Sequence, residues 1–212
     1  MIKLYRFDLS TNVERVELAL AHKGIAVEKI DVDPEDRSVV RAVSGQDLVP
    51  VIVDENPGGT AAGPQIVIDS MEIVRYLEGK HPARPLYPAD PARRSEMLVF
   101  IDWFNRVWKR PPNDIVAEMR AAAPDASRIE RLGRAMTEAL DLFEGMLSGR
   151  DHLMGEFSAA DIAAFPFVKY AIIHPEGDDE LFHQVLIKYQ PLGSSHPRLE
   201  AWIRRVDERP RA

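Results

Sequence analysis

The pattern of apolar and polar residues divides the chain into two halves of different character. In the first 82 residues, "KLYRFDL", "AVEKIDVD", "VPVIVD" and "QIVID" are short apolar or alternating runs that predict strands. Helical spacing in "NVERVELALAHKG", "PEDRSVVRAVSG" and "SMEIVRYLE" predicts three helices between and after them. The predicted order is strand, helix, strand, helix, strand, strand, helix. The first three elements form a parallel β-α-β unit, and the last two strands form a hairpin on the same sheet.

Strand signals largely vanish after the proline-rich linker at residues 83–91. In "EMLVFIDWFNRVWKR", Met97, Ile101, Phe104 and Trp108 lie on one helical stripe, and the following prolines break or bend that helix. Three more helices are predicted from "SRIERLGRAMTEALDLFEGML", "FSAADIAAFPFVKYAII" and "RLEAWIRRVDE". We therefore expect an α/β domain over residues 1–82 and an all-α domain over residues 92–212.

Composition narrows the classes of function. The 212 residues carry a net charge of −7 with both signs scattered along the chain, which argues against binding to nucleic acid or to an anionic membrane. The longest apolar stretch is too short to span a bilayer, and the start has no signal-peptide pattern, so a cytoplasmic location is expected. Cysteine is absent, which removes disulfides and thiol nucleophiles, and the six histidines show no paired spacing, so no metal site is expected.

Asp69 and Ser70 stand where the last predicted strand becomes a helix. Asp69 is placed to cap "SMEIVRYLE", with Glu72 three residues later, and Ser70 is then the first helical residue. The free backbone N–H of Ser70, its hydroxyl and the positive end of the helix all favour an anion. The alternative is an ordinary capped helix without a ligand.

Ser10 is the candidate chemical residue. Thr11 and Glu14 form T-x-x-E, a capping box for the first helix, which would leave the Ser10 hydroxyl free just before a helix N-terminus. The alternative is that Ser10 itself is the cap and Thr11 is exposed. In the second half, Ser158 and Asp161 form a similar S-x-x-D box, which is a structural signal.

Ser10, the pair Val49-Pro50, the pair Asp69-Ser70 and "FSAAD" occur in an order and spacing that resembles the cytosolic glutathione S-transferase family. Taken alone, Pro50 would be read as a trans proline at the start of a strand, because only about 5–6% of X-Pro bonds are cis. The resemblance instead implies a thioredoxin-like first domain and a cis Pro50, with the Val49 backbone pairing with glutathione. It also implies that Ser70 binds the γ-glutamyl carboxylate, that Asp69 pairs with the adjacent ammonium, and that Ser10 supports the thiolate.

The chain has no cysteine, and Arg6 stands near the position of the family's tyrosine. In these two respects the chain is similar to serine-type members of the theta, zeta and related bacterial groups. The implied activity adds the glutathione thiolate to a small apolar electrophile or assists an isomerisation; the alternative is a non-catalytic scaffold. A homodimer is also implied. The partner of the glycyl carboxylate stays open among Arg37, Arg41 and Gln46. The long turn from Asp54 to Gln65 is expected to lie away from the site, and residues 174–197 match no pattern.

Overall fold

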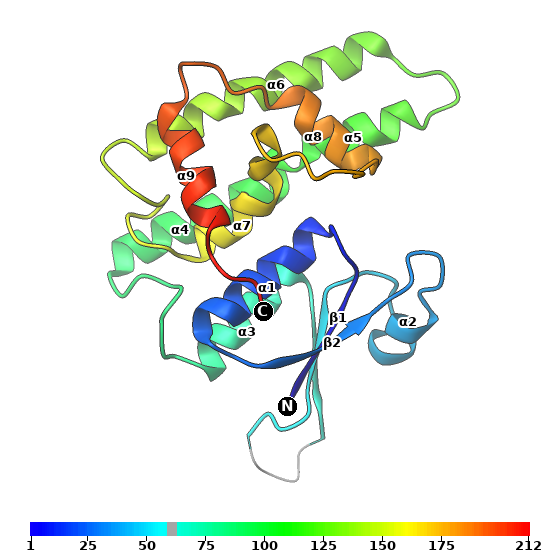
Figure 1. Ribbon diagram of the computed structural model, residues 1–212, viewed down its shortest axis with the longest axis vertical. Helices are drawn as coiled ribbons and strands as arrows, with labels where there is room; N and C mark the ends of the chain where they lie inside the picture. The colour runs from blue at the N-terminus through cyan, green and yellow to red at the C-terminus, as the bar shows by residue number, and fades with distance from the viewer. Residues whose placement is uncertain (59–62) are drawn as a thin grey trace. The chain divides into compact units, whose positions relative to one another are not determined.

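The structure is a computed structural model that describes residues 1–58 and 63–212. Contacts divide the chain into a first unit, Met1–Leu86 with Arg209–Ala212, and a second unit, Tyr87–Glu208 (Figure 1). The last four residues thus group with the first half of the chain. Arg211 Nη2 lies 2.7 Å from Glu14 Oε1, and the Ala212 N–H donates to the Glu17 carbonyl at 3.2 Å.

The first unit is an α/β layer structure with the predicted element order. Its four strands lie in the order β2-β1-β3-β4, with β2 parallel to β1 and with β3 antiparallel to both β1 and β4. The predicted β-α-β unit and hairpin are therefore confirmed. The elements are β1 (Ile2–Arg6), α1 (Thr11–Lys23), β2 (Val27–Asp31), α2 (Ser38–Ser44), β3 (Val51–Asp54), β4 (Gln65–Ile68) and α3 (Ser70–Lys80).

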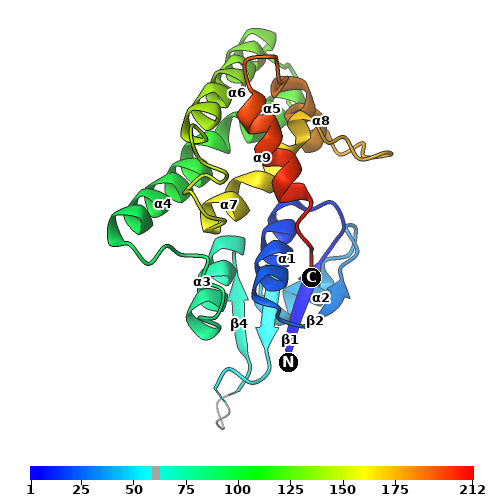
Figure 2. The same cartoon turned by 60° about the vertical axis from the view of Figure 1, so that its left-hand side comes forward.

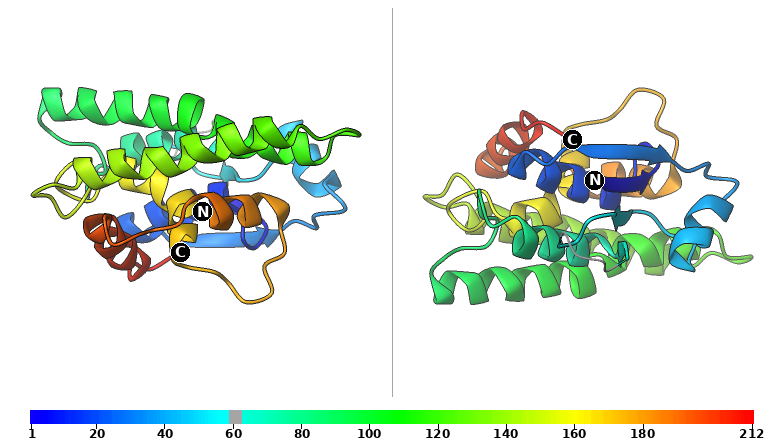
Figure 3. Two further views of the ribbon diagram at one scale, coloured as in Figure 1. Left: turned by 90° about the horizontal axis from the view of Figure 1, so that it is seen from above. Right: turned by 90° about the horizontal axis from the view of Figure 1, so that it is seen from below.

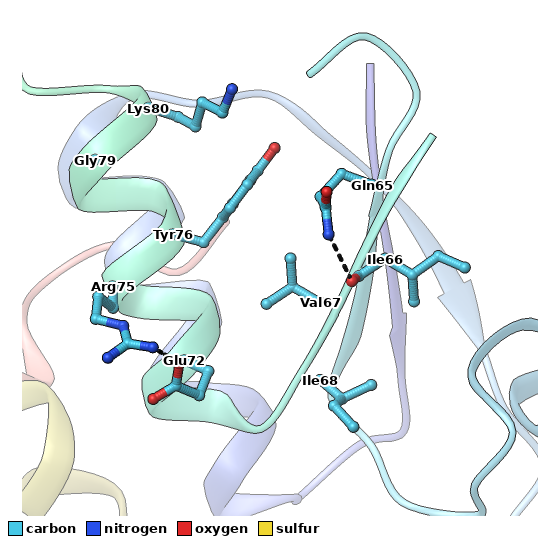
Figure 4. A pocket seen from close by; sticks show the side chains of 9 residues that line it. All are labelled: Gln65, Ile66, Val67, Ile68, Glu72, Arg75, Tyr76, Gly79 and Lys80. Atoms are coloured by element: carbon cyan, nitrogen blue, oxygen red, sulfur yellow. Dashed lines mark hydrogen bonds and ion pairs between the residues drawn. The ribbon is translucent and has the colours of Figure 1, made fainter. Parts of the chain in front are cut away.

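Strand register decides which side chains share a face of this sheet. Leu4 pairs with Ile52, which pairs with Val67, so these three lie on one face, and Val67 points toward α3 (Figure 4). Side chains alternate along a strand, so the next row, which includes Tyr5 and Val51, lies on the other face. There Val51 packs with Val40 of α2. Figure 2 shows α1 and α3 side by side, so helices cover both faces of the sheet.

The second unit is helical, and no strand forms anywhere in its described residues. The predicted stripe of Met97, Ile101, Phe104 and Trp108 is buried. Its helix passes into a short π-helix before the two prolines, which begin α5, and α6 runs alongside α5 (Figure 3). The elements are α4 (Pro91–Trp103), η1 (Phe104–Trp108), α5 (Arg110–Met119), α6 (Ala126–Met146), α7 (Ala159–Val168), η2 (Lys169–Ala171), α8 (Leu181–Tyr189) and α9 (Pro197–Asp207).

Helix α7 forms the centre of the second unit, because all ten of its residues are buried. Ser158 and Asp161 form the predicted capping box at its start. Asp161 is fully buried and accepts hydrogen bonds from the backbone N–H of Ser158 at 2.9 Å and from Trp202 Nε1 at 2.8 Å. The capping carboxylate therefore also ties α9 to α7. Phe104 and Trp108 stack with ring centres 4.5 Å apart, as expected of core residues.

The segment that matched no sequence pattern contains helix α8 and a buried polar contact. The Asp178 carboxylate lies 2.8 Å from His183 Nδ1, and both side chains are buried. At the end of α8, the Tyr189 ring lies against α6 at Gly133, where a Cβ atom would come within 2.3 Å of a ring carbon. A glycine at 133 is what permits this close approach. None of the described helices is both long and apolar enough to cross a bilayer.

Candidate functional site

The strand register brings the predicted site segments to one end of the sheet. Tyr5 pairs with Val51, and Val51 pairs with Ile68, so the end of β1, the start of β3 and the end of β4 are adjacent. After β1 the chain continues toward Ser10. Pro50 directly precedes β3, and β4 is followed by Asp69 and then by Ser70, which begins α3. Three segments that are far apart in the sequence therefore meet at this end.

The long turn after β3 leaves from the opposite end of the sheet, where Asp54 pairs with Gln65. Residues 59–62 of that turn lie outside the described part of the chain. At its start, Asp54 is buried and its Oδ2 accepts a hydrogen bond from the Tyr76 hydroxyl at 2.7 Å. Burial and this hydrogen bond raise the pKa of Tyr76 well above its usual value. The contact fixes the end of β3 to α3.

The peptide bond between Val49 and Pro50 is cis, which confirms the prediction. Pro50 is buried, and Val49 is half-buried against Val40 and Val51. Pro50 lies directly before β3, and at this position its missing N–H removes no hydrogen bond from the sheet.

Asp69 is the N-cap of α3, as predicted. Its Oδ1 accepts the backbone N–H of Met71 at 2.9 Å and of Glu72 at 3.2 Å. Ser70 is the first helical residue and is only 3% exposed, whereas Asp69 is exposed. Asp69 has a positive φ of 67°, which is uncommon for a residue with a side chain. This backbone turn carries the chain directly from β4 into α3.

The predicted capping of α1 by Thr11 is wrong, because Ser10 is the N-cap. Ser10 has extended dihedrals, its carbonyl accepts the Glu14 N–H at 3.0 Å, and its Oγ accepts the Val13 N–H at a long 3.4 Å. Thr11 is the first helical residue and is buried rather than exposed. The Glu14 carboxylate, which the T-x-x-E pattern assigns to the box, pairs with Arg211. Arg211, near the end of the chain, thus binds the carboxylate that the T-x-x-E pattern requires for its capping box.

Sequence reasoning missed Arg15, a buried cation between α1 and α3. Arg15 is 2% exposed, and its Nη1 donates to Ser70 Oγ at 3.2 Å and to Asn12 Oδ1 at 3.3 Å. Burial lowers the pKa of Arg15 to about 9, while the charge of Asp69 opposes this shift. The signal in the sequence was weak: Leu18 and Ala19, at i+3 and i+4, are apolar and lie on the same side of the helix as Arg15.

Arg6 and Tyr5 lie on opposite faces of the sheet, as strand alternation predicts. Arg6 is held by carboxylates, with Nε 3.4 Å from Glu17 Oε1 and Nη1 3.5 Å from Asp31 Oδ1. The three candidates for a glycyl carboxylate make local contacts. These contacts are Arg37 Nε to the Pro34 carbonyl at 2.9 Å, Arg41 Nε to Asp47 Oδ1 at 2.6 Å, and Gln46 Nε2 to the Leu48 carbonyl at 3.2 Å.

A groove of about 700 Å³ lies between α3 and the edge strand β4, and neither Ser10 nor Ser70 lines it (Figure 4). All four of Ile66, Val67, Ile68 and Tyr76 line the groove, and the side chains of Ile66 and Ile68 point away from α3. The two isoleucines are 41% and 44% exposed. This groove is a surface feature distinct from the end of the sheet where Ser10, Pro50 and Ser70 meet.

Comparison with known proteins identifies the family. Residues 4–85 match the family model for the glutathione S-transferase N-terminal domain, and residues 126–205 match the one for the C-terminal domain. The chain therefore belongs to the glutathione S-transferase family.

Individual relatives are distant but span most of the chain. Glutathione S-transferase GstB of Escherichia coli K12 is 27% identical, over 99% of this chain and 95% of its own length. FtsZ-localized protein A of Caulobacter vibrioides is 26% identical, over 76% of this chain and 73% of its own length. The crystal structure of a glutathione S-transferase from Rhodospirillum rubrum F11 superposes with a TM-score of 0.70 at 26% identity, covering 99% of this chain and 89% of that one.

Proposed function

We propose that this protein is a glutathione transferase that ionises glutathione and adds its thiolate to a small apolar electrophile, or assists a glutathione-dependent isomerisation. The observation that supports this most is the convergence of Ser10, Pro50 and Ser70 at one end of the sheet. A scaffold protein has no need to keep a hydroxyl, a cis proline and a capped helix start together there. Family membership points the same way.

The proposed binding mode uses the residues of 1–82. The Val49 backbone pairs with the cysteinyl unit of glutathione as an added strand would. The Ser70 N–H and hydroxyl, at the positive end of α3, bind the γ-glutamyl carboxylate. The exposed Asp69 carboxylate pairs with the neighbouring ammonium. Glutathione is the co-substrate in this scheme, and no metal is required.

Ser10 can support the thiolate while it caps α1. Its oxygen accepts the Val13 N–H, and the hydroxyl proton stays available for donation to sulfur. An ordinary thiol titrates near ~8.5, so only about 3% is thiolate at pH 7. A hydrogen bond to a charged group contributes roughly 1.5–3 kcal/mol, which lowers the thiol pKa by about one to two units. The thiol proton leaves to solvent, the sulfur forms a bond to the electrophilic carbon, and a leaving group departs with the electron pair.

A non-catalytic scaffold is the second candidate. The relative in Caulobacter vibrioides bears the name FtsZ-localized protein A, so proteins similar to this chain carry names other than transferase. Fold alone does not decide between the two candidates.

Retention on glutathione-agarose followed by turnover of an aryl halide tests the proposal. We expect the protein to be retained, to be eluted by free glutathione, and to release halide with formation of a thioether. The matched control is the Ser10→Ala variant, which should be retained but slow. Retention without turnover across several electrophiles would favour the scaffold, and no retention would contradict glutathione binding altogether.

We further propose a homodimer in which the first half of one subunit contacts the second half of the other. Two surfaces are suited to it. One is β4, with its exposed Ile66 and Ile68. The other is the exposed apolar side of α4 and η1, where Leu98, Val99 and Val107 are 47%, 70% and 54% exposed. Soluble oligomers favour two-fold closure, in which each copy supplies both surfaces.

A further inference from the structure

Arg15 is a buried cation directly beneath the start of α3. It lies on α1, five residues after Ser10, and its Nη1 donates to Ser70 Oγ at 3.2 Å. The Arg15 guanidinium is only 2% exposed, and burying such a charge costs free energy unless it is paired and hydrogen-bonded. Its position is therefore set by the groups that bind it. Asp69, immediately before Ser70, is the charged group that favours the cationic form of Arg15.

The direction of this hydrogen bond fixes what the Ser70 hydroxyl can do. A guanidinium has only donors, so Ser70 Oγ must be the acceptor. A serine hydroxyl has one proton and two lone pairs, and with a lone pair facing Arg15 its own proton points elsewhere. That proton is then available to an acceptor on the side away from α1. A serine without this neighbour could turn its proton into the protein instead.

The charge of Arg15 acts in the same direction as the helix start. The first turn of α3 already favours anions through its backbone N–H groups and its dipole. A second, fixed positive charge behind Ser70 adds to this field in a buried environment, where screening by water and salt is weak. With a pKa of about 9, Arg15 is cationic at neutral pH.

We propose that Arg15 is a positioning residue for the γ-glutamyl carboxylate of glutathione, since it orients the Ser70 hydroxyl toward that carboxylate and strengthens the anion site at the start of α3. This role rests on the proposed function, because it presupposes that glutathione binds at Ser70. Arg15 donates to Ser70 Oγ at 3.2 Å, so in this proposal it acts on the carboxylate through Ser70.

The test compares two ligands that differ only in the α-carboxylate of the γ-glutamyl group. Calorimetry measures the dissociation constants of glutathione and of 4-aminobutyryl-cysteinyl-glycine, which lacks the α-carboxylate. We expect Arg15→Met to weaken glutathione binding roughly tenfold, as for loss of a hydrogen bond to a charged group, and the analogue less than twofold. The turnover number at saturating glutathione should stay nearly unchanged, because the thiol is held at Ser10.

Ser70→Ala and Arg211→Gln complete the design. In the Ser70→Ala background, Arg15→Met should add little, because both changes remove the same contact. Arg211 also pairs with α1, through Glu14 at 2.7 Å, and Arg211→Gln leaves the hydrogen bond between Arg15 and Ser70 in place, so this variant should bind glutathione like the wild type. Arg15→Lys keeps the cation and should lose less affinity than Arg15→Met. It also carries the ligand comparison if Arg15→Met does not fold.

The outcomes separate this role from the proposed function. Equal losses for both ligands would mean that Arg15 only supports the fold, and unchanged glutathione binding would also overturn the role. In both cases the wild type still binds glutathione, so the proposed function stands. A wild-type protein that does not bind glutathione would overturn the proposed function and this role with it.

Discussion

The Ser10 hydroxyl is proposed to take part in two hydrogen bonds, and a substitution can separate them. In Ser10→Ala we expect turnover at pH 7 to fall about ten- to a hundredfold, which corresponds to losing roughly 1.4–2.8 kcal/mol of thiolate stabilisation. The pH–rate profile should shift upward, because the mutant recovers when hydroxide ionises the thiol. The cap costs about 1 kcal/mol at most, since its bond is a long 3.4 Å. Steady-state rates from pH 6 to 9 and a thermal melt measure both effects.

Two neighbouring variants control for this experiment. Ser10→Thr keeps a hydroxyl and should retain much of the rate. Thr11→Val removes the adjacent hydroxyl, which the structure buries inside the first turn, and should leave the pH profile unchanged. If Ser10→Ala melts early while the rate per folded molecule stays intact, Ser10 is only a cap.

At the residue scale, local sequence patterns predicted local contacts and failed for distant ones. Asp69 and Ser70 were predictable because a cap and its N–H donors lie within three residues of each other. Thr11 was assigned the cap wrongly, since Glu14 pairs with Arg211, almost the full chain length away. Arg15 was missed for the same reason: its partner Ser70 is 55 positions distant, and periodicity alone does not distinguish a buried arginine from a solvated one.

At the scale of elements, the contact between α6 and α8 depends on one missing side chain. A Cβ atom at Gly133 would lie 2.3 and 2.4 Å from two carbons of the Tyr189 ring. Overpacking typically costs about 1–3 kcal/mol, and alanine in a helix regains about 1 kcal/mol of this cost. We therefore expect Gly133→Ala to lower the free energy of unfolding by up to about 2 kcal/mol, measured by urea denaturation.

The same helix offers the matched control. A Cβ atom at Gly145 would meet no atom within 4 Å, so Gly145→Ala should stabilise α6 by up to about 1 kcal/mol. Replacing Tyr189 by leucine in the Gly133→Ala background should restore stability, since the clash is with the ring. Equal effects of the two glycine substitutions would contradict the packing argument.

Elements with strong local signals were predictable, and those defined by packing were not. The capping box of Ser158 and Asp161 and the buried stripe from Met97 to Trp108 follow from spacing alone. Helix α8 gave no usable pattern, and its residues meet α5 and α6 through non-local contacts such as that of Tyr189 with Gly133. The turn after β3 could be foreseen to leave from the far end of the sheet, since a hairpin joins opposite ends of its strands.

At the scale of the whole molecule, the α/β first half, the four-stranded sheet and the helical second half followed from the sequence. The order of the elements was sufficient for this, because a β-α-β unit and a hairpin leave few topologies open. The grouping of Arg209–Ala212 with the first unit was not foreseen. It depends on the pairing of Arg211 with Glu14, and this pairing belongs to no sequence motif.

The proposed dimer yields a prediction about the assembled molecule. Light scattering at micromolar concentration should give twice the 23.9 kDa mass of the chain.

Val99 is 70% exposed on α4, so Val99→Lys should leave each subunit folded while placing a charge in the apolar interface, at a cost of several kcal/mol. We therefore expect this variant to shift toward the monomer. Val39→Lys is the matched control, because Val39 is 49% exposed on α2, outside both proposed surfaces, and should leave the mass unchanged. A wild-type protein of monomer mass would contradict the dimer, and a Val99→Lys dimer as tight as the wild type would place the interface elsewhere.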